Sequence, residues 1–128
     1  MNKITFVGFP FEKMVLYQKS QEWADLAERL ATRTRSSTSY GMVDQLLRAA
    51  NSIPLNIAEG LGRWGINDRK RFFQIARGSV FECVPILSFF KRRQFITIEE
   101  YQAAYCLLDE LGKMLTSMLK TNHREKAP

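Results

Sequence analysis

The sequence contains very little histidine and cysteine. Its 128 residues include one histidine, His123, and two cysteines, Cys83 and Cys106. No Ser-His-Asp or Cys-His arrangement can be built around a single histidine near the end of the chain. A zinc site needs closely paired ligands and a di-iron bundle needs Glu-x-x-His motifs, and neither pattern occurs in the sequence. We therefore expect no enzymatic activity, no metal site and no cofactor.

Long uncharged apolar runs are also lacking. A membrane-spanning helix needs about 18 such residues, and the longest apolar stretch, residues 79–90, is interrupted by Glu82 and Pro85. The N-terminal segment MNKITFVGFPFEK has too short an apolar region for a secretory signal. We expect a cytoplasmic protein, because thiols stay reduced in that compartment. Packing in apolar helix faces is the leading interpretation of both cysteines, and a redox role is the alternative.

Positive charge, in contrast, is abundant and unevenly placed. Lys and Arg number 19 against 13 Asp and Glu, which gives a net charge of +6 and a pI of about 9.6. Residues 61–95 hold eight basic and two acidic residues and so carry the whole surplus. Such asymmetry indicates a surface that attracts a polyanion. The alternative is a solvated face that keeps the protein soluble.

Apolar residues recur at helical spacing in four segments. These segments cover residues 11–32, 40–64, 67–93 and 97–121. Their lengths and short connectors predict an all-α, up-down-up-down antiparallel four-helix bundle. We assign residues 1–10 to an N-terminal leader, residues 11–121 to the bundle domain and residues 122–128 to a polar tail.

Polar residues mark the predicted helix starts. Ser39 is a candidate cap for the second helix, and Asn67 with Asp68 supplies an N-cap and a favourable charge for the third. Thr97 and Glu100 match the S/T-x-x-E capping box and open the fourth.

The second and third helices are expected to fold back on each other at residues 65 and 66. This register places Pro54, which interrupts the hydrogen bonding of its own helix, level with Gly78. A residue without a side chain opposite a kink predicts a close approach of the two backbones. A ligand site at this position is the less favoured alternative.

The same register brings opposite charges near each other. It places Arg77 within about one turn of Glu59, and Arg48 within about one turn of Glu82. Semi-buried ion pairs at these positions would fix the register of the bundle more than they would stabilise it.

Two sequence blocks resemble a known family. QLLRAANSIPLNIAEGLGR (residues 45–63) and RFFQIARGSVFE (residues 71–82), preceded by VLYQKSQEWADLAERL (residues 15–30), are similar to four-helix bundle proteins encoded in intervening sequences of bacterial large-subunit ribosomal RNA genes. The accessory variability determinants of diversity-generating retroelements belong to the same superfamily. The resemblance covers residues 11–119, and the leader departs from it. The motif residues to which we assign a structural role are Arg48, Pro54, Asn56, Glu59, Gly60, Arg77, Gly78 and Glu82.

The resemblance implies a homopentameric barrel of four-helix bundles without enzymatic activity. For the retroelement branch, it also implies binding of RNA or DNA and of the element's reverse transcriptase. For the intervening-sequence branch, it implies no defined role. The motif is shared by the four-helix bundles of the superfamily and does not distinguish the intervening-sequence branch from the retroelement branch.

The leading hypothesis is a non-catalytic bundle that binds nucleic acid through two clusters. The turn cluster contains Arg63, Trp64, Arg69, Lys70 and Arg71, and the distal cluster contains Lys91, Arg92 and Arg93. The cations would contact phosphates, and Trp64 could stack on an unpaired base. We expect the side chains of residues 69–71 to lie in solvent. The alternative function is a structural or protein-interaction bundle with no direct nucleic-acid role.

Two pairs of adjacent phenylalanines bear on assembly. Phe72 and Phe73 are neighbours, as are Phe89 and Phe90, and neighbours on a helix differ by about 100 degrees in direction. One member of each pair should therefore lie on the side of the bundle, where it would suit a subunit interface.

Overall fold

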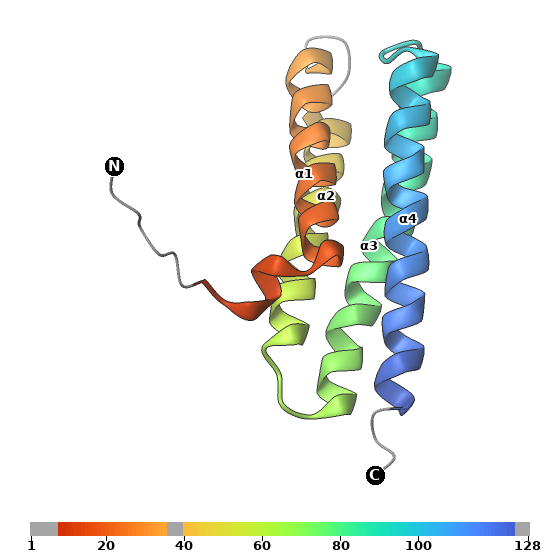
Figure 1. Cartoon of the computed structure of the whole chain (residues 1–128). Helices are drawn as coiled ribbons and strands as arrows, with labels where there is room; N and C mark the ends of the chain where they lie inside the picture. The colour runs from red at the N-terminus through yellow and green to blue at the C-terminus, as the bar shows by residue number, and fades with distance from the viewer. Residues whose placement is uncertain (1–7, 36–39, 125–128) are drawn as a thin grey trace, which may run out of the picture.

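The chain folds into four long helices, as Figure 1 shows for the computed structural model, which describes residues 8–35 and 40–124. They are α1 (Val15–Thr34), α2 (Tyr40–Leu61), α3 (Ile66–Arg92) and α4 (Ile98–Arg124). Each helix runs antiparallel to the next, and α1 also contacts α4, which closes the bundle. The described residues contain no strand. The predicted all-α four-helix bundle is confirmed.

The first helix begins later than its apolar pattern predicts. A short 3₁₀ helix, η1 (Pro10–Lys13), precedes α1 and is separated from it by the extended backbone of Met14. Pro10 suits the start of η1 because its fixed φ is pre-organised and its missing N–H is not needed there. Residues 1–7 and 125–128 lie outside the described part of the chain, so the leader and tail limits stay predictions.

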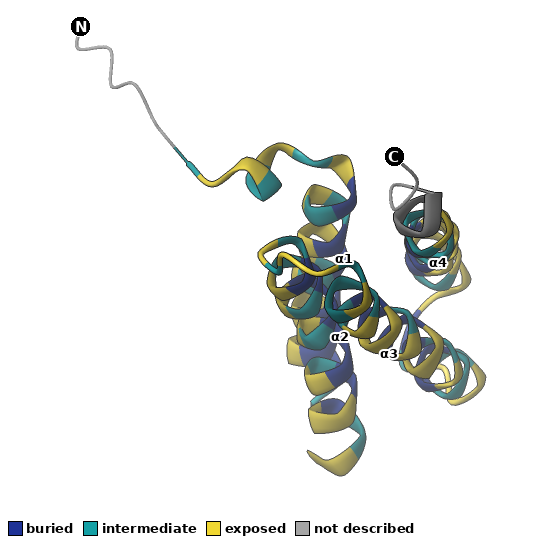
Figure 2. Ribbon diagram, turned by 90° about the horizontal axis from the view of Figure 1, so that it is seen from below, coloured by how far each residue is buried: buried dark blue, intermediate teal, exposed yellow. Residues whose placement is uncertain are grey.

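The core is built from one face of each helix, shown in dark blue in Figure 2. Trp23 from α1, with Phe73 and Phe90 from α3, are the largest side chains that are fully buried. Cys83 is buried beside Trp23, whereas Cys106 on α4 is exposed. The prediction that both cysteines pack in the core is therefore wrong for Cys106, which lies on the outer side of its helix.

The helix starts agree only in part with their predicted caps. The Thr97–Glu100 capping box is confirmed: Thr97 N donates to Glu100 Oε1 (2.7 Å) and Glu100 N donates to Thr97 Oγ1 (3.1 Å). The N-cap of α3 is Gly65, without a side-chain hydrogen bond, so Asn67 and Asp68 lie inside the first turn instead of capping it. The proposed cap Ser39 lies outside the described residues.

A hydrogen bond between two serine side chains joins α2 to α3, and an asparagine of α2 supports it. Ser79 Oγ donates to Ser52 Oγ (2.9 Å), and Asn56 Nδ2 donates to the carbonyl oxygen (2.8 Å) and Oγ (3.0 Å) of Ser52. The contacts Ser52–Ser79 and Gly60–Phe73 lie one residue to either side of the predicted register, in which Pro54 is level with Gly78. Pro54 is buried, and α2 continues past it to Leu61.

The close approach of α2 and α3 occurs at Gly60 and not at Gly78. A Cβ atom on Gly60 would lie 2.8 Å from Phe73 Cε1 and 3.2 Å from the Arg69 carbonyl oxygen. A Cβ atom on Gly78 would meet nothing within 4 Å, because Gly78 is exposed. The predicted contact at Gly78 is wrong because Gly78 lies on the exposed face of α3, so being level with Pro54 does not bring it toward α2.

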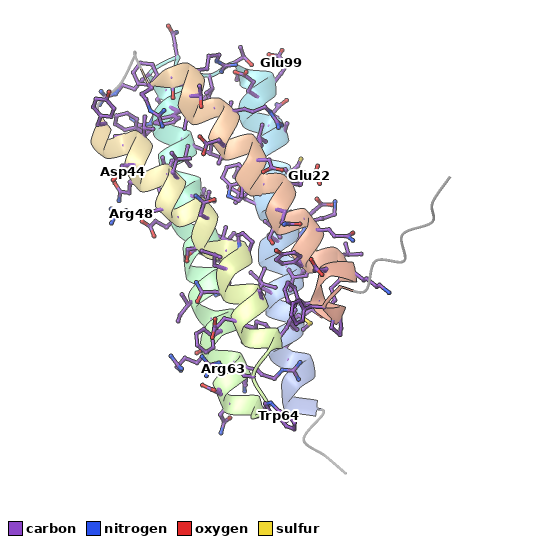
Figure 3. All side chains as sticks on the ribbon, turned by 90° about the vertical axis from the view of Figure 1, so that its left-hand side faces the viewer. Glu22, Asp44, Arg48, Arg63, Trp64 and Glu99 are labelled. Carbon is purple, nitrogen blue, oxygen red and sulfur yellow. The ribbon has the colours of Figure 1, made fainter. Side chains whose placement is uncertain are left out.

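Neither predicted ion pair between α2 and α3 forms among the described residues. Arg77 turns toward α4, where its Nε donates to Thr116 Oγ1 (3.0 Å), and Glu59 instead pairs with Arg63. Arg48 and Glu82 line one shallow hollow with Ser52 and Ser79 without a salt bridge between them. Both residues are exposed, and Figure 3 shows Arg48 on the outside of α2.

One described helix, α3, is long and apolar enough to cross a membrane by length and composition alone. In the bundle it packs against α2 and α4 and buries Phe73, Val80, Leu87 and Phe90. The helix therefore has the features of a central core helix.

Candidate nucleic-acid interface

The turn between α2 and α3 presents a tryptophan at the end of the bundle. Arg63 N donates to the Gly60 carbonyl oxygen (3.1 Å), and Gly62 N donates to the Ala58 carbonyl oxygen (3.1 Å). The chain thus leaves α2 in a tight turn, and Trp64 at its tip is 100% exposed. Figure 3 shows Trp64 beside Arg63 at this end of the molecule. A fully exposed indole offers a free face for stacking.

Two arginines of the turn cluster are held by acidic neighbours. Arg63 Nη2 donates to Glu59 Oε2 (2.6 Å), and its Nη1 lies 3.6 Å from Asp68 Oδ2. Arg71 Nη2 donates to Asp68 Oδ1 (3.1 Å). Residues 59–71 hold four basic and two acidic side chains, so the local net charge is +2. The turn cluster is therefore less positive than its basic residues alone indicate.

The same arginines cover a side-facing phenylalanine. The guanidinium carbons of Arg63 and Arg71 lie 4.7 and 4.4 Å from the centroid of the Phe72 ring. Phe72 is half-buried, while Phe73 is fully buried in the core. One member of this pair lies on the side of the bundle, as predicted, and cation–π contacts shield it from water.

Arg69 and Lys70 are half-buried, so the expectation that they point freely into solvent is wrong. Arg69 lies against the α2–α3 contact, and its own carbonyl oxygen approaches Gly60. Packing against the bundle restricts how far these two side chains can reach.

The distal cluster is composed differently. Lys91 Nζ lies 4.5 Å from the Tyr101 ring centroid, and Arg93 Cζ lies 4.2 Å from that of Phe89. Arg92 is exposed. None of the three cations forms an ion pair with an acidic residue in the described ranges, so the cluster keeps its full charge of +3. Phe89 is half-buried beside the buried Phe90, which repeats the arrangement of the first pair.

The two clusters lie at opposite ends of α3. At 1.5 Å per residue, the helix rise from Lys70 to Arg92 separates them by roughly 33 Å. Figure 1 shows the α2–α3 turn at one end of the bundle and the end of α3 at the other. Within one subunit they are two separate surfaces.

In the described part of the chain, no group of three or more His, Cys, Asp or Glu residues could hold a metal ion. The side chain of His123 lies outside that part. Burial raises the pKa of the Cys83 thiol to about 12, and the nearby Trp23 indole opposes the rise. A thiol with that pKa is protonated at neutral pH and a poor nucleophile.

Sequence reasoning missed one further surface, a groove between α3 and α4 that contains Arg77. Phe81 and Tyr105 on its edges are 57% and 44% exposed. These aromatic residues lie off the core stripes of their helices, which is the signal that could have revealed the groove.

Comparison with known proteins identifies relatives of the chain. The model of the family described as 23S rRNA-intervening sequence protein matches residues 12–117. A crystal structure of a protein of unknown function from the S23 ribosomal protein family of Bacteroides thetaiotaomicron is similar, with a TM-score of 0.79 and 28% sequence identity. The similarity covers 83% of this chain and 99% of that chain. No curated protein matches the sequence.

Proposed function

The chain belongs to the 23S rRNA-intervening sequence protein family, and from this premise we propose that it is a non-catalytic, homopentameric bundle that binds RNA or DNA through phosphates. The observation that carries the proposal is the distal cluster. Lys91, Arg92 and Arg93 place three positive charges together with no acidic partner among the described residues. Phosphate oxygens are the ligands that such unpaired cations favour.

The turn cluster supports the proposal in a second way. Trp64 adds a stacking surface for an unpaired base, and such stacking contributes about 1–3 kcal/mol. Arg63 and Arg71 are already engaged by carboxylates, so we assign the larger electrostatic contribution to the distal cluster.

Assembly would multiply these contacts. The half-buried Phe72 and Phe89 on the sides of the bundle suit a subunit interface, and the homopentamer follows from the family resemblance. In a ring, each cluster repeats once per subunit, so weak contacts combine through avidity.

The protein partner depends on the branch of the superfamily. For an accessory protein of a retroelement, the partner is a reverse transcriptase, and a neighbouring reverse transcriptase gene with template and variable repeats would support it. A reading frame inside a ribosomal RNA gene would favour the other branch. We place the protein in the cytoplasm, where the thiols of Cys83 and Cys106 remain reduced.

A binding titration tests the function directly. Structured RNA, single-stranded DNA and duplex DNA are titrated with the full chain at several salt concentrations. Simultaneous replacement of Lys91, Arg92 and Arg93 by Gln should weaken binding of every nucleic acid that the parent protein binds. Each lost phosphate contact should also reduce the slope of log K against log salt by about 0.7 for a single strand or about 0.9 for a duplex.

A matched triple variant ranks the two clusters. Replacing Arg69, Lys70 and Arg71 by Gln removes the same charge, but two of these side chains are half-buried and one is paired with Asp68. We expect its loss of affinity and of salt slope to be smaller than that of the distal variant. A parent protein without salt-sensitive binding would contradict the proposal and favour a protein-interaction bundle.

A further inference from the structure

The groove between α3 and α4 is an apolar surface outside both charge clusters. It encloses about 390 Å³. Its apolar lining consists of Val80, Phe81, Val84, Pro85, Tyr105 and Leu108. Phe81 and Tyr105 are more exposed than apolar residues of a closed helix pair usually are.

Polar contacts hold one end of the groove in shape. Arg77 Nε donates to Thr116 Oγ1 (3.0 Å), and Thr116 Oγ1 in turn donates to the Gly112 carbonyl oxygen (2.9 Å). The Arg77 guanidinium also lies 4.5 Å from the centroid of the Phe81 ring. The groove is thus formed before any partner binds.

A glycine inside α4 keeps the groove open. Gly112 lies within a long helix, where glycine is less favourable than alanine. A Cβ atom there would meet only Val80 Cγ1, at an ordinary 3.8 Å. Packing within the subunit therefore does not require glycine at this position, whereas an occupant of the groove would benefit from the missing side chain.

The segment from Phe9 to Val15, here called the foot, carries a complementary apolar surface. Phe9 is 70% exposed and Val15 is 55% exposed. The Phe9 ring stacks on Phe11 (5.9 Å between centroids), and Phe11 packs edge-on against Tyr17 (4.9 Å). Phe9 N also donates to Glu12 Oε1 (2.8 Å). These contacts hold an aromatic ring in a fixed position pointing into solvent.

The foot and the groove face opposite sides of the subunit. Figures 1 and 2 show the foot on the α1 and α2 side, with the body of the bundle between it and the α3–α4 pair. Trp23 lies beside Cys83, so Val15, eight residues earlier in α1, lies level with Ile75 on the parallel α3. The foot is therefore within about one helical turn of the Arg77 end of the groove along the bundle axis. Two apolar surfaces on opposite sides of a subunit can join copies head to tail, and such contacts form a closed ring when the rotation between copies closes.

We propose that the foot of one copy docks in the α3–α4 groove of the next copy, with Phe9 as the aromatic anchor. The inference rests on the proposed oligomer and names its dominant contact, which is separate from the side-facing Phe72 and Phe89. A projecting aromatic side chain that fills an apolar groove is typical of residues that dominate binding energy. The mode is heterologous, so each subunit uses one foot and one groove.

Two single variants block the two halves of this contact. Phe9→Asp places a charge on the anchor, and Gly112→Leu fills the groove with a residue that favours helix. Each variant should self-associate about 30-fold or more weakly than the parent, as expected for loss of a dominant contact. Light scattering at micromolar concentration should then give the mass of the 14.8 kDa monomer for each variant. Circular dichroism and thermal melts show whether each variant keeps its helices. Ile98→Asp, at a 53% exposed position away from both surfaces, is the control and should keep the mass of the parent.

Mixing the two variants identifies the mode of contact. Phe9→Asp retains an intact groove and Gly112→Leu retains an intact foot, so an equimolar mixture should form a dimer and nothing larger. A folded variant with the mass of the parent, or a mixture that stays monomeric, would overturn the docking inference while leaving the oligomer intact. A parent that is itself monomeric would overturn both the inference and the pentamer, but the salt-dependent binding test would still decide the nucleic-acid role.

Discussion

Replacement of Gly60 by alanine should destabilise the bundle, although alanine favours helix. The new Cβ atom would lie 2.8 Å from Phe73 Cε1, 3.0 Å from Phe73 Cδ1 and 3.2 Å from the Arg69 carbonyl oxygen. Phe73 is fully buried, so its ring has no free space into which to move. Overpacking of this kind costs about 1–3 kcal/mol. The gain in helix propensity is at most about 1 kcal/mol and is smaller here, because α2 ends at Leu61.

The expected net loss is about 1–2 kcal/mol, which corresponds to a decrease in Tm of roughly 4–8 °C for a domain of this size. Thermal and urea unfolding measure it, at one fixed protein concentration because assembly also shifts apparent stability. Gly78→Ala is the matched control, since its Cβ atom meets nothing within 4 Å and its helix should gain about 0.5–1 kcal/mol.

The free energy of unfolding should therefore decrease in Gly60→Ala and increase in Gly78→Ala. Phe73→Leu should cost less stability in the Gly60→Ala background than in the parent, because the smaller side chain removes the clash. A Gly60→Ala protein as stable as Gly78→Ala would refute the close approach of α2 and α3 at this position.

Three further predictions concern single side chains. Arg33 holds the pKa of Glu100 at about 2 through a two-pronged ion pair in which Arg33 Nη2 donates to Glu100 Oε1 (2.7 Å). Because this folded-state pKa is depressed, the stabilisation is present above about pH 4.5 and is lost as the pH falls toward 2. Glu100→Gln, which keeps a capping side chain, should lower the free energy of unfolding by about 1 kcal/mol at pH 7. If the free energy of unfolding differs from that of the parent by the same amount at pH 7 and at pH 2, the ion pair is contradicted. Trp64→Ala should leave stability within about 0.5 kcal/mol of the parent, because the side chain is wholly exposed, and a clear drop in Tm would show that the indole packs. In the native protein, Cys106 should react with a thiol reagent at pH 8, whereas Cys83 should react only after unfolding. Mass spectrometry of labelled peptides measures both labelling rates. Equal rates for the two cysteines would contradict the burial of Cys83.

Periodicity predicted the fold because it depends on features that are local in sequence. The apolar stripe of residues 43–57 identifies the buried face of α2, and the Thr97–Glu100 box identifies the start of α4 within one residue. Both signals arise within one or two helical turns. No knowledge of the neighbouring helix is needed to interpret them.

The contacts between helices were harder to predict, because they depend on register and rotation together. The sequence indicated which residues of α2 and α3 lie level with each other, but not which glycine faces the neighbouring helix: Gly78 is exposed, and the close approach occurs at the buried Gly60. Arg77 faces α4 instead of Glu59, and the sequence does not specify which of two neighbouring helices a boundary residue will contact.

The acidic partners of the turn cluster were visible in the sequence. Glu59 and Arg63 are four residues apart, and Asp68 and Arg71 are three apart, which are the spacings at which charges meet on a helix surface. Counting the cations alone overestimated the positive charge at this end. The distal cluster has no acidic residue between Lys91 and Thr97, and its charge remained unpaired.

The distance between the clusters leads to a last prediction, on ligand length. To contact phosphate, Arg63 would have to leave Glu59 and Asp68, and the carboxylates left behind would repel the ligand. The distal cations need to break no ion pair, and the partial negative charge of about half a unit at the end of α3 is small beside their three full charges. Phosphate binding should therefore concentrate at the distal end, while stacking occurs at Trp64, roughly 35–40 Å away along the 27-residue α3.

At the stacked rise of 3.4 Å per nucleotide, one strand needs about ten or more nucleotides to reach both ends. Trp64→Ala should weaken binding of longer single strands roughly tenfold, within the range that one stacked base contributes, and should leave binding of five-nucleotide strands, about half that length, nearly unchanged. Fluorescence titration of a length series measures both. An equal effect of Trp64→Ala at all lengths would mean that the tryptophan and the distal cations do not share one ligand along the subunit.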